Sequence, residues 1–144
     1  MAIWKSNPTI AHVNQMQRGT ISEVLGIEML EIGADFLRGR MPVDARTKQP
    51  MGLLHGGASA VLAETLGSVA GKLCLDPGKA CVGLEINANH IRAVRGGHVT
   101  GTAKPVHLGG RTQVWNIEIV DEHGKIVCVS RLTLAIIVTD QIAR

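Results

Sequence analysis

The chain has 144 residues, 45% of them hydrophobic, and a formal net charge of +3. This length and composition predict a single globular domain covering residues 1–144 and exclude a disordered chain. One Phe and two Trp leave too few stacking platforms for single-stranded nucleic acid, so we expect no nucleic-acid partner. No apolar stretch reaches the length of a membrane span without polar interruption, so we expect no membrane association.

The three cysteines, Cys74, Cys81 and Cys128, are odd in number and lack CxxC spacing. This pattern predicts reduced, buried thiols and no disulfide framework. The first residues, MAIWKSNPTI, contain no long apolar stretch of the kind that a signal peptide needs. We therefore expect a cytoplasmic protein.

Residues 1–25 are predicted to form a helical segment. Apolar side chains at Ile10, Val13 and Met16 recur every three positions within Thr9–Gly19, which indicates a short amphipathic helix. A second short helix is expected over Thr20–Leu25, followed by two strands over Ile27–Ile32 and Asp35–Pro42.

The clearest helix signal runs from Gly57 to Leu75, a segment rich in Ala and Leu. The following Asp76-Pro77-Gly78 ends this central helix, because Pro cannot continue a helix. At 1.5 Å per residue the helix is about 28 Å long. Small residues recur along it every three or four positions, which predicts a face that strands approach closely. They are Ala60, Ala63, Gly67, Ala70 and Gly71.

The remainder of the chain is predicted to be strand. Alternation over Ala80–His90 places Val82, Leu84 and Ile86 on one face. Three more strands follow, over His98–Leu108, Arg111–Asp121 and Ile126–Val138. One long helix lying across an antiparallel sheet is an α+β fold. Because a single helix covers only one face of the sheet, we expect the protein to be a dimer or a larger homo-oligomer.

The candidate site begins where the sequence reads His55-Gly56-Gly57, at the start of the central helix. The first backbone N–H groups of a helix have no intrahelical partner, and the helix dipole favours a negative oxygen beside them. Gly56 and Gly57 let a substrate approach closely, because they carry no Cβ. This arrangement would stabilise a thioester carbonyl that becomes tetrahedral. A glycine-rich helix start without a ligand is the alternative interpretation.

Glu64 lies in the middle of the helix among apolar residues. In a partly dry cleft its carboxylate could act as a general base on water or as a nucleophile on a thioester. Ser68 lies one turn later on the same face and could orient the water or the carboxylate. A solvated glutamate and a serine bonded to the helix backbone are the structural alternatives.

Other polar residues allow further hypotheses. His55 is not expected to form a serine triad, because the sequence has no GxSxG motif, and we expect it to orient the loop or the thioester. His90 and Arg92, with Arg95 nearby, could bind phosphate groups, or could form a solvated basic strand end. The histidine spacing predicts no metal site, and the sequence has no P-loop or dinucleotide motif.

These residues resemble the hotdog-fold acyl-CoA thioesterases of the PaaI-like branch, in particular the hydrolases of 1,4-dihydroxy-2-naphthoyl-CoA and the enterobactin-proofreading thioesterases. The resemblance extends from Ile3-Trp4-Lys5 to the last strand. Its most specific part is His55-Gly56-Gly57, with Gln49 upstream and Glu64 eight residues after Gly56. The other matching segments are Met41–Asp44, Arg46-Thr47, Gln49-Pro50, Leu53–Ser59 and Leu62–Ser68.

The resemblance implies a hotdog fold, in which an antiparallel sheet wraps a long helix, two subunits join their sheets and dimers pair into tetramers. It also implies active sites at the subunit interface and hydrolysis of an acyl-CoA, with coenzyme A as part of the substrate and no cofactor. Glu64 would be the nucleophile or general base, and the Gly56 N–H the oxyanion donor. Gln49 would lie near the carbonyl or the attacking water, and His55 and Ser68 would support the site. His90 and Arg92 would lie near the coenzyme A nucleotide, and Gly57 would contact the substrate.

The expected substrate carries an aromatic or medium-length acyl group. One alternative is a hotdog hydratase or dehydratase acting on enoyl thioesters. Such enzymes typically need a pair of Asp and His, and no Asp accompanies His55 within the helix. A second alternative is a module that binds acyl-CoA without turning it over.

Overall fold

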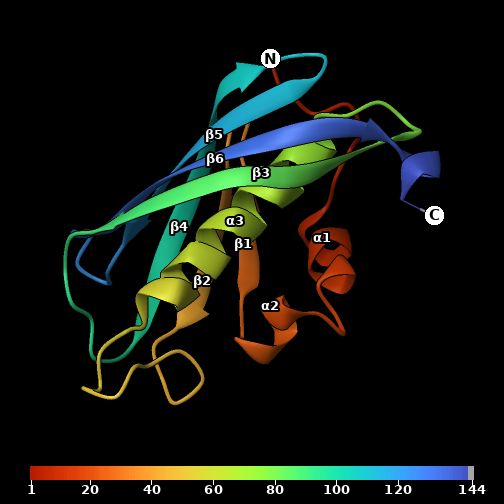
Figure 1. The fold of residues 1–144 in the computed structure, drawn as a ribbon. Coiled ribbons are helices and arrows are strands. Elements are labelled where there is room, and N and C mark those ends of the chain that lie inside the picture. The colour runs from red at the N-terminus through yellow and green to blue at the C-terminus, as the bar shows by residue number, and fades with distance from the viewer. Residues whose placement is uncertain (143–144) are drawn as a thin grey trace.

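The computed structural model describes residues 1–142, which form one long helix, a six-stranded sheet and short helices near the two ends (Figure 1). The helices are α1 (Ile10–Met16), α2 (Ile21–Val24), α3 (Gly56–Leu73) and the 3-10 helix η1 (Thr139–Gln141). The strands are β1 (Glu28–Ile32), β2 (Leu37–Pro42), β3 (Lys79–His90), β4 (His98–Leu108), β5 (Thr112–Val120) and β6 (Ile126–Val138). Every predicted element is present, but some bounds differ: α3 is Gly56–Leu73 and not Gly57–Leu75, and α1 ends at Met16 and not near Gly19. Only Ile10–Met16 and Ile21–Val24 are helical within residues 1–25, and η1 was not predicted.

The six strands pair antiparallel in the order β1-β2-β4-β5-β6-β3. The helix α3 lies across one face of this curved sheet (Figure 1). Leu62 and Leu66 of α3 share one buried cluster with Trp115 and Ile117 of β5 and Leu132 of β6. The predicted α+β arrangement, a long helix wrapped by an antiparallel sheet, is therefore confirmed.

The small residues of α3 allow the close approach that their spacing predicts. A Cβ added to Gly67 would lie 2.6 Å from Leu132 Cδ2, and one added to Gly71 would lie 2.5 Å from Leu134 Cδ1. Both leucines are fully buried on β6. The helix thus rests directly on the sheet.

A buried hydrogen-bonded pair ties β5 to α3. The Trp115 indole N–H donates to Gln113 Oε1 at 2.9 Å, and Gln113 Nε2 donates to the Gly71 carbonyl at 3.3 Å. Trp115 is fully buried and Gln113 is 2% exposed. The Gly71 carbonyl also accepts from the Cys74 N–H at 3.2 Å, so it does not depend on Gln113 alone.

The prediction that Val82, Leu84 and Ile86 share one face of β3 is wrong. The pairing of β3 with β6 is irregular between Gly83 and Glu85. A β-bulge adds a residue to one strand, so the alternation reverses across it. Ile86 is therefore half-buried, whereas Val82 and Leu84 are 43% and 62% exposed.

The twelve-residue strand β3 is also an edge of the sheet, with no neighbour on its outer side among residues 1–142. Val82 and Leu84 are exposed on this strand. By contrast, the face of the sheet opposite α3 carries charged residues at exposed positions, namely Lys104, Glu118 and Arg131. An unpaired edge strand is a template for pairing with another chain.

Two further findings concern membrane-spanning helices and the cysteines. Within residues 1–142, no helix combines the length and the apolar composition needed to cross a membrane. All three cysteines are free, and burial raises the pKa of the Cys74 thiol to about 11. Burial also raises the pKa of Cys81 and Cys128.

Candidate active site

His55 caps the start of α3. His55 has an extended backbone conformation and stands immediately before the first helical residue. Its Nδ1 accepts a hydrogen bond from the Gly57 N–H at 2.8 Å. A neutral imidazole whose Nδ1 accepts must carry its proton on Nε2. The His55 N–H donates to the Thr47 carbonyl at 2.8 Å, which fixes the cap to the preceding loop.

The two glycines after His55 differ in what they offer a ligand. The Gly57 N–H is occupied by His55, and Gly57 is exposed. For the Gly56 N–H, by contrast, the described residues provide no acceptor. The sequence predicts substrate contacts for both glycines, whereas the structure leaves only the Gly56 N–H available as a donor.

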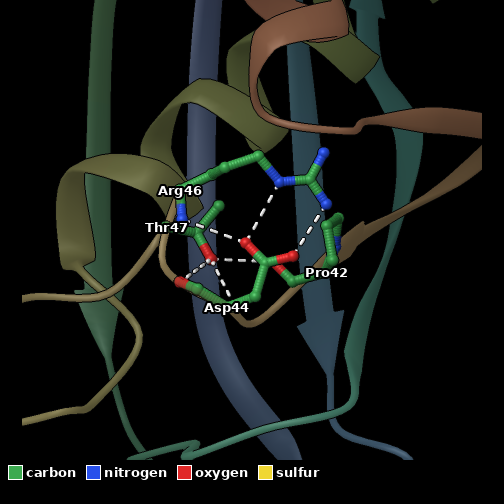
Figure 2. A network of polar contacts seen from close by, with 4 residues as sticks. All are labelled: Pro42, Asp44, Arg46 and Thr47. Atoms are coloured by element: carbon green, nitrogen blue, oxygen red, sulfur yellow. Dashed lines mark hydrogen bonds and ion pairs between the residues drawn. The ribbon is translucent and has the colours of Figure 1, made fainter.

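The loop before α3 is held in place by Asp44, Arg46 and Thr47 (Figure 2). The Arg46 guanidinium donates to both Asp44 oxygens, at 3.1 and 2.7 Å, and this lowers the pKa of Asp44 to about 2. The Thr47 hydroxyl donates to the Pro42 carbonyl at 2.7 Å, at the end of β2. Since the Thr47 carbonyl accepts from His55, this network connects β2 to the start of α3.

Gln49 lies in the same loop and is half-buried. Its side-chain oxygen accepts from the Met51 N–H, and its backbone N–H donates to the Leu53 carbonyl at 2.8 Å. With its oxygen engaged, the Gln49 amide presents N–H donors to its surroundings. This orientation suits a carbonyl oxygen as the partner.

A first cavity, of about 300 Å³, opens between this loop, the start of α3 and the end of β3. We call it the helix-start cavity, and four of its lining residues are Gln49, Gly56, His90 and Arg92. The His90 ring lies against Gly56, because a Cβ added to Gly56 would be 2.6 Å from His90 Nε2. The structure thus brings together four of the predicted site residues.

A second cavity, of about 250 Å³, lies farther along α3. We call it the mid-helix cavity, and it is lined by Glu64 and Ser68 together with Gln17 and Ile21 of the N-terminal segment. Glu64 and Ser68 therefore share a face of the helix, as predicted. The part played by the N-terminal segment was missed, because its sequence carries no chemical motif.

The Glu64 carboxylate has an unusual neighbour. A Cβ added to Gly83 of β3 would overlap Glu64 Oε1, and it would lie 3.6 Å from Glu64 Cδ. Sequence reasoning missed Gly83, although a lone glycine within a strand pattern is a known sign of a bulge or a close approach. Among residues 1–142 the carboxylate has no hydrogen-bond or ion-pair partner.

The two cavities do not form one site within a single chain. Eight residues separate Gly56 from Glu64, which is about 12 Å along the helix axis and about 80° around it. An attacked carbonyl must lie about 3 Å from both its nucleophile and its oxyanion donor. One chain therefore contains both the Gly56 donor and the Glu64 carboxylate, but it does not place them around the same substrate carbonyl.

Known proteins are similar to this chain in sequence and in fold. The family model described as the thioesterase superfamily matches residues 51–128, more than half of the chain. The 1,4-dihydroxy-2-naphthoyl-CoA hydrolase of Escherichia coli strain K12 is 57% identical over 135 residues, which are 94% of this chain and 99% of the relative. The proofreading thioesterase EntH of Cronobacter turicensis is 53% identical over 134 residues, 93% of this chain and 98% of the relative.

The solved structures agree. The crystal structure of a thioesterase from Haemophilus influenzae matches with a TM-score of 0.93 and 52% identity, over 94% of this chain and 95% of that one. A Q49A mutant of a Pseudomonas aeruginosa thioesterase matches with a TM-score of 0.93 and 46% identity, over 95% and 99% of the two chains. The fold is thus the hotdog fold of thioesterases, and the protein is a thioester hydrolase. The chain belongs to the thioesterase superfamily.

Proposed function

We propose that this enzyme hydrolyses acyl-CoA thioesters with an aromatic acyl group, at an active site completed by a second copy of the chain. Two relatives support the substrate class, since one is named for 1,4-dihydroxy-2-naphthoyl-CoA and the other is the proofreading thioesterase EntH. A medium-length acyl group is the second choice. The reaction joins a water oxygen to the acyl carbon, breaks the carbon–sulfur bond and gives the proton to the coenzyme A thiolate.

The residues take the following roles in this proposal. Glu64 activates water as a general base, or attacks the carbonyl as a nucleophile. The Gly56 N–H stabilises the oxyanion, and the Gln49 amide donates to the carbonyl or the water. Supporting roles belong to His55, which caps the helix, and to Ser68, which lies beside Glu64 in the mid-helix cavity. His90 and Arg92, in the helix-start cavity, interact with coenzyme A.

The observation that carries the proposal is the separation of Gly56 and Glu64 into two cavities. A homodimer in which β3 pairs with β3 of a second copy would set two α3 helices side by side. The helix-start cavity of one chain, with Gly56, would then lie beside the mid-helix cavity of the other chain, with Glu64, and the two would form one active site. The exposed Val82 and Leu84 on the unpaired edge support such a pairing. We propose a dimer or a tetramer, and the free cysteines support a cytoplasmic location.

Substitution of Glu64 tests the chemistry. We expect Glu64→Ala to lower kcat with benzoyl-CoA by roughly 100- to 10,000-fold, the range typical of a lost acid–base group. Glu118→Ala, at an exposed position on the far face of the sheet, is the matched control and should keep wild-type activity. Near wild-type hydrolysis by Glu64→Ala would refute the proposed catalytic role of Glu64. Single-turnover reaction in heavy-oxygen water separates the two mechanisms, because a nucleophilic Glu64 acquires label in its own carboxylate.

Complementation tests the shared site. Gln49→Ala and Glu64→Ala chains, each impaired alone, are co-expressed in equal amounts. If each site takes Gln49 from one chain and Glu64 from the other, half of the dimers are mixed and each mixed dimer has one intact site. About a quarter of wild-type activity then returns. If one chain holds the entire site, every site carries a substitution and the mixture stays as inactive as its components.

A further inference from the structure

The bulge in β3 turns Gly83 toward the helix. Gly83 pairs with Leu134 of β6, and after the bulge Ile86 pairs with Leu132. Both leucines are fully buried beneath α3, so their β3 partners lie on the same inner side of the sheet. The extra residue, Leu84, is 62% exposed and takes no part in this inner face. Gly83, although exposed at the unpaired edge, thus lies on the inner side of the sheet and carries no side chain there.

The Glu64 carboxylate occupies the space that a side chain at Gly83 would fill. A Cβ at Gly83 would overlap Glu64 Oε1 and would lie 4.0 Å from Leu132 Cδ1. No hydrogen bond or ion pair holds this carboxylate among residues 1–142, and the space left free at Gly83 is what admits it to this position. On one side it meets the Gly83 backbone, and on the other it borders the mid-helix cavity with Ser68.

We propose that Gly83 is a positioning residue for thioester hydrolysis, because its missing side chain lets the Glu64 carboxylate lie against β3 and face the mid-helix cavity. This inference rests on the catalytic role proposed for Glu64. A Cβ at this position displaces the carboxylate, and a displacement of about 1 Å costs roughly 100-fold in rate. The residues proposed to contact coenzyme A line the other cavity, so substrate affinity should change little.

Backbone strain does not complicate the substitution. Gly83 is not among the glycines with positive φ, so alanine can adopt its conformation. Alanine in a strand is also no less stable than glycine, which costs more conformational entropy on folding. Gly83→Ala should therefore keep or raise Tm while it lowers kcat, a combination that a merely structural role would not produce.

The experiment measures kcat, KM, Tm and oligomeric state for Gly83→Ala with benzoyl-CoA. We expect kcat to fall roughly 100-fold with KM within about threefold of wild type. Gly110→Ala is the matched control, because an added Cβ at Gly110 meets no atom within 4 Å and its φ is not positive. It should match wild type in all four measurements.

Combination with Glu64→Asp tests the contact itself. Aspartate is shorter by one methylene and withdraws its carboxylate from Gly83. In the Glu64→Asp background, Gly83→Ala should therefore lower kcat by less than about tenfold, against roughly 100-fold in the wild-type background. An equal loss in both backgrounds would place the effect elsewhere and overturn the inference.

The remaining outcomes are also decisive. Wild-type kcat in Gly83→Ala overturns the inference, and if Glu64→Ala is inactive in the same assay, the proposed function still stands. Loss of kcat together with a lower Tm or a changed oligomeric state also overturns it. If Glu64→Ala keeps wild-type hydrolysis, the failure belongs to the proposed role of Glu64, which the first assay detects independently of Gly83.

Discussion

The buried pair formed by Gln113 and Trp115 gives a sharp test of what holds α3 to the sheet. Substitution of Gln113 by Leu keeps a similar volume and removes the acceptor of the Trp115 indole N–H, which lies 2.9 Å from Gln113 Oε1. Trp115 is fully buried, so its N–H finds no water. The Gly71 carbonyl keeps its bond from the Cys74 N–H, which limits the damage to one orphaned donor.

The expected cost follows from that single donor. A buried polar group left without a partner costs about 1–3 kcal/mol. For a chain of this size, 1 kcal/mol corresponds to roughly 2–4 °C in Tm, so we expect Gln113→Leu to lower Tm by roughly 2–12 °C. Thermal unfolding followed by circular dichroism measures this shift, at a fixed protein concentration because Tm of an oligomer depends on concentration.

A double-mutant cycle isolates the hydrogen bond from the packing. Trp115→Phe leaves some empty core volume and leaves the buried Gln113 Oε1 without its donor, while the double variant Gln113→Leu/Trp115→Phe contains neither partner. Because the double variant has neither an unpaired donor nor an unpaired acceptor, it should be more stable than the sum of the single effects predicts, by about 1–3 kcal/mol for each group left unpaired in a single variant. Effects that add within about 0.5 kcal/mol would refute the view that this bond matters to the core.

Three other predictions concern the loop, the oxyanion donor and the thiols. Arg46→Gln should lower Tm slightly at pH 7, and the difference from wild type should close between about pH 4 and about pH 2, because the depressed pKa of Asp44 contributes stability only while its carboxylate is ionised. Gly56→Pro removes the proposed donor at a helix position that tolerates proline, and should lower kcat roughly 100- to 1,000-fold below Gly56→Ala, which adds a Cβ but keeps the N–H. A thiol reagent at pH 7 should label the native cysteines slowly and all of them in denaturant, since burial keeps Cys74 protonated with a pKa of about 11. A Tm difference for Arg46→Gln that does not change with pH would contradict the first prediction. Equal kcat values for Gly56→Pro and Gly56→Ala would contradict the second, and rapid labelling of the cysteines in the native protein would contradict the third.

Local patterns in the sequence were sufficient for most of the architecture. The run of Ala, Leu and Gly before Asp76-Pro77-Gly78 predicted the long helix, and alternating apolar residues predicted the strands close to their observed ends. These signals are short-range, because periodicity and breakers act within a few residues. The candidate catalytic groups could also be identified from the sequence. The Glu64 carboxylate and the glycine at the helix start, Gly56, are recognised without knowledge of any tertiary contact. Their assignment as a pair depended on family resemblance.

Tertiary structure decided how those candidates are arranged. The bulge after Gly83 arises from the pairing of β3 with β6, so alternation within β3 alone assigned Leu84 and Ile86 to one face. The contact between Gly83 and Glu64 joins a strand to a helix nearly twenty residues earlier, and only the packing of α3 on the sheet creates it. The same packing leaves Gly56 and Glu64 in separate cavities. The sequence by itself determined which groups are available for chemistry, whereas long-range pairing decided which of them meet, because contacts between distant segments leave no periodic trace in either one.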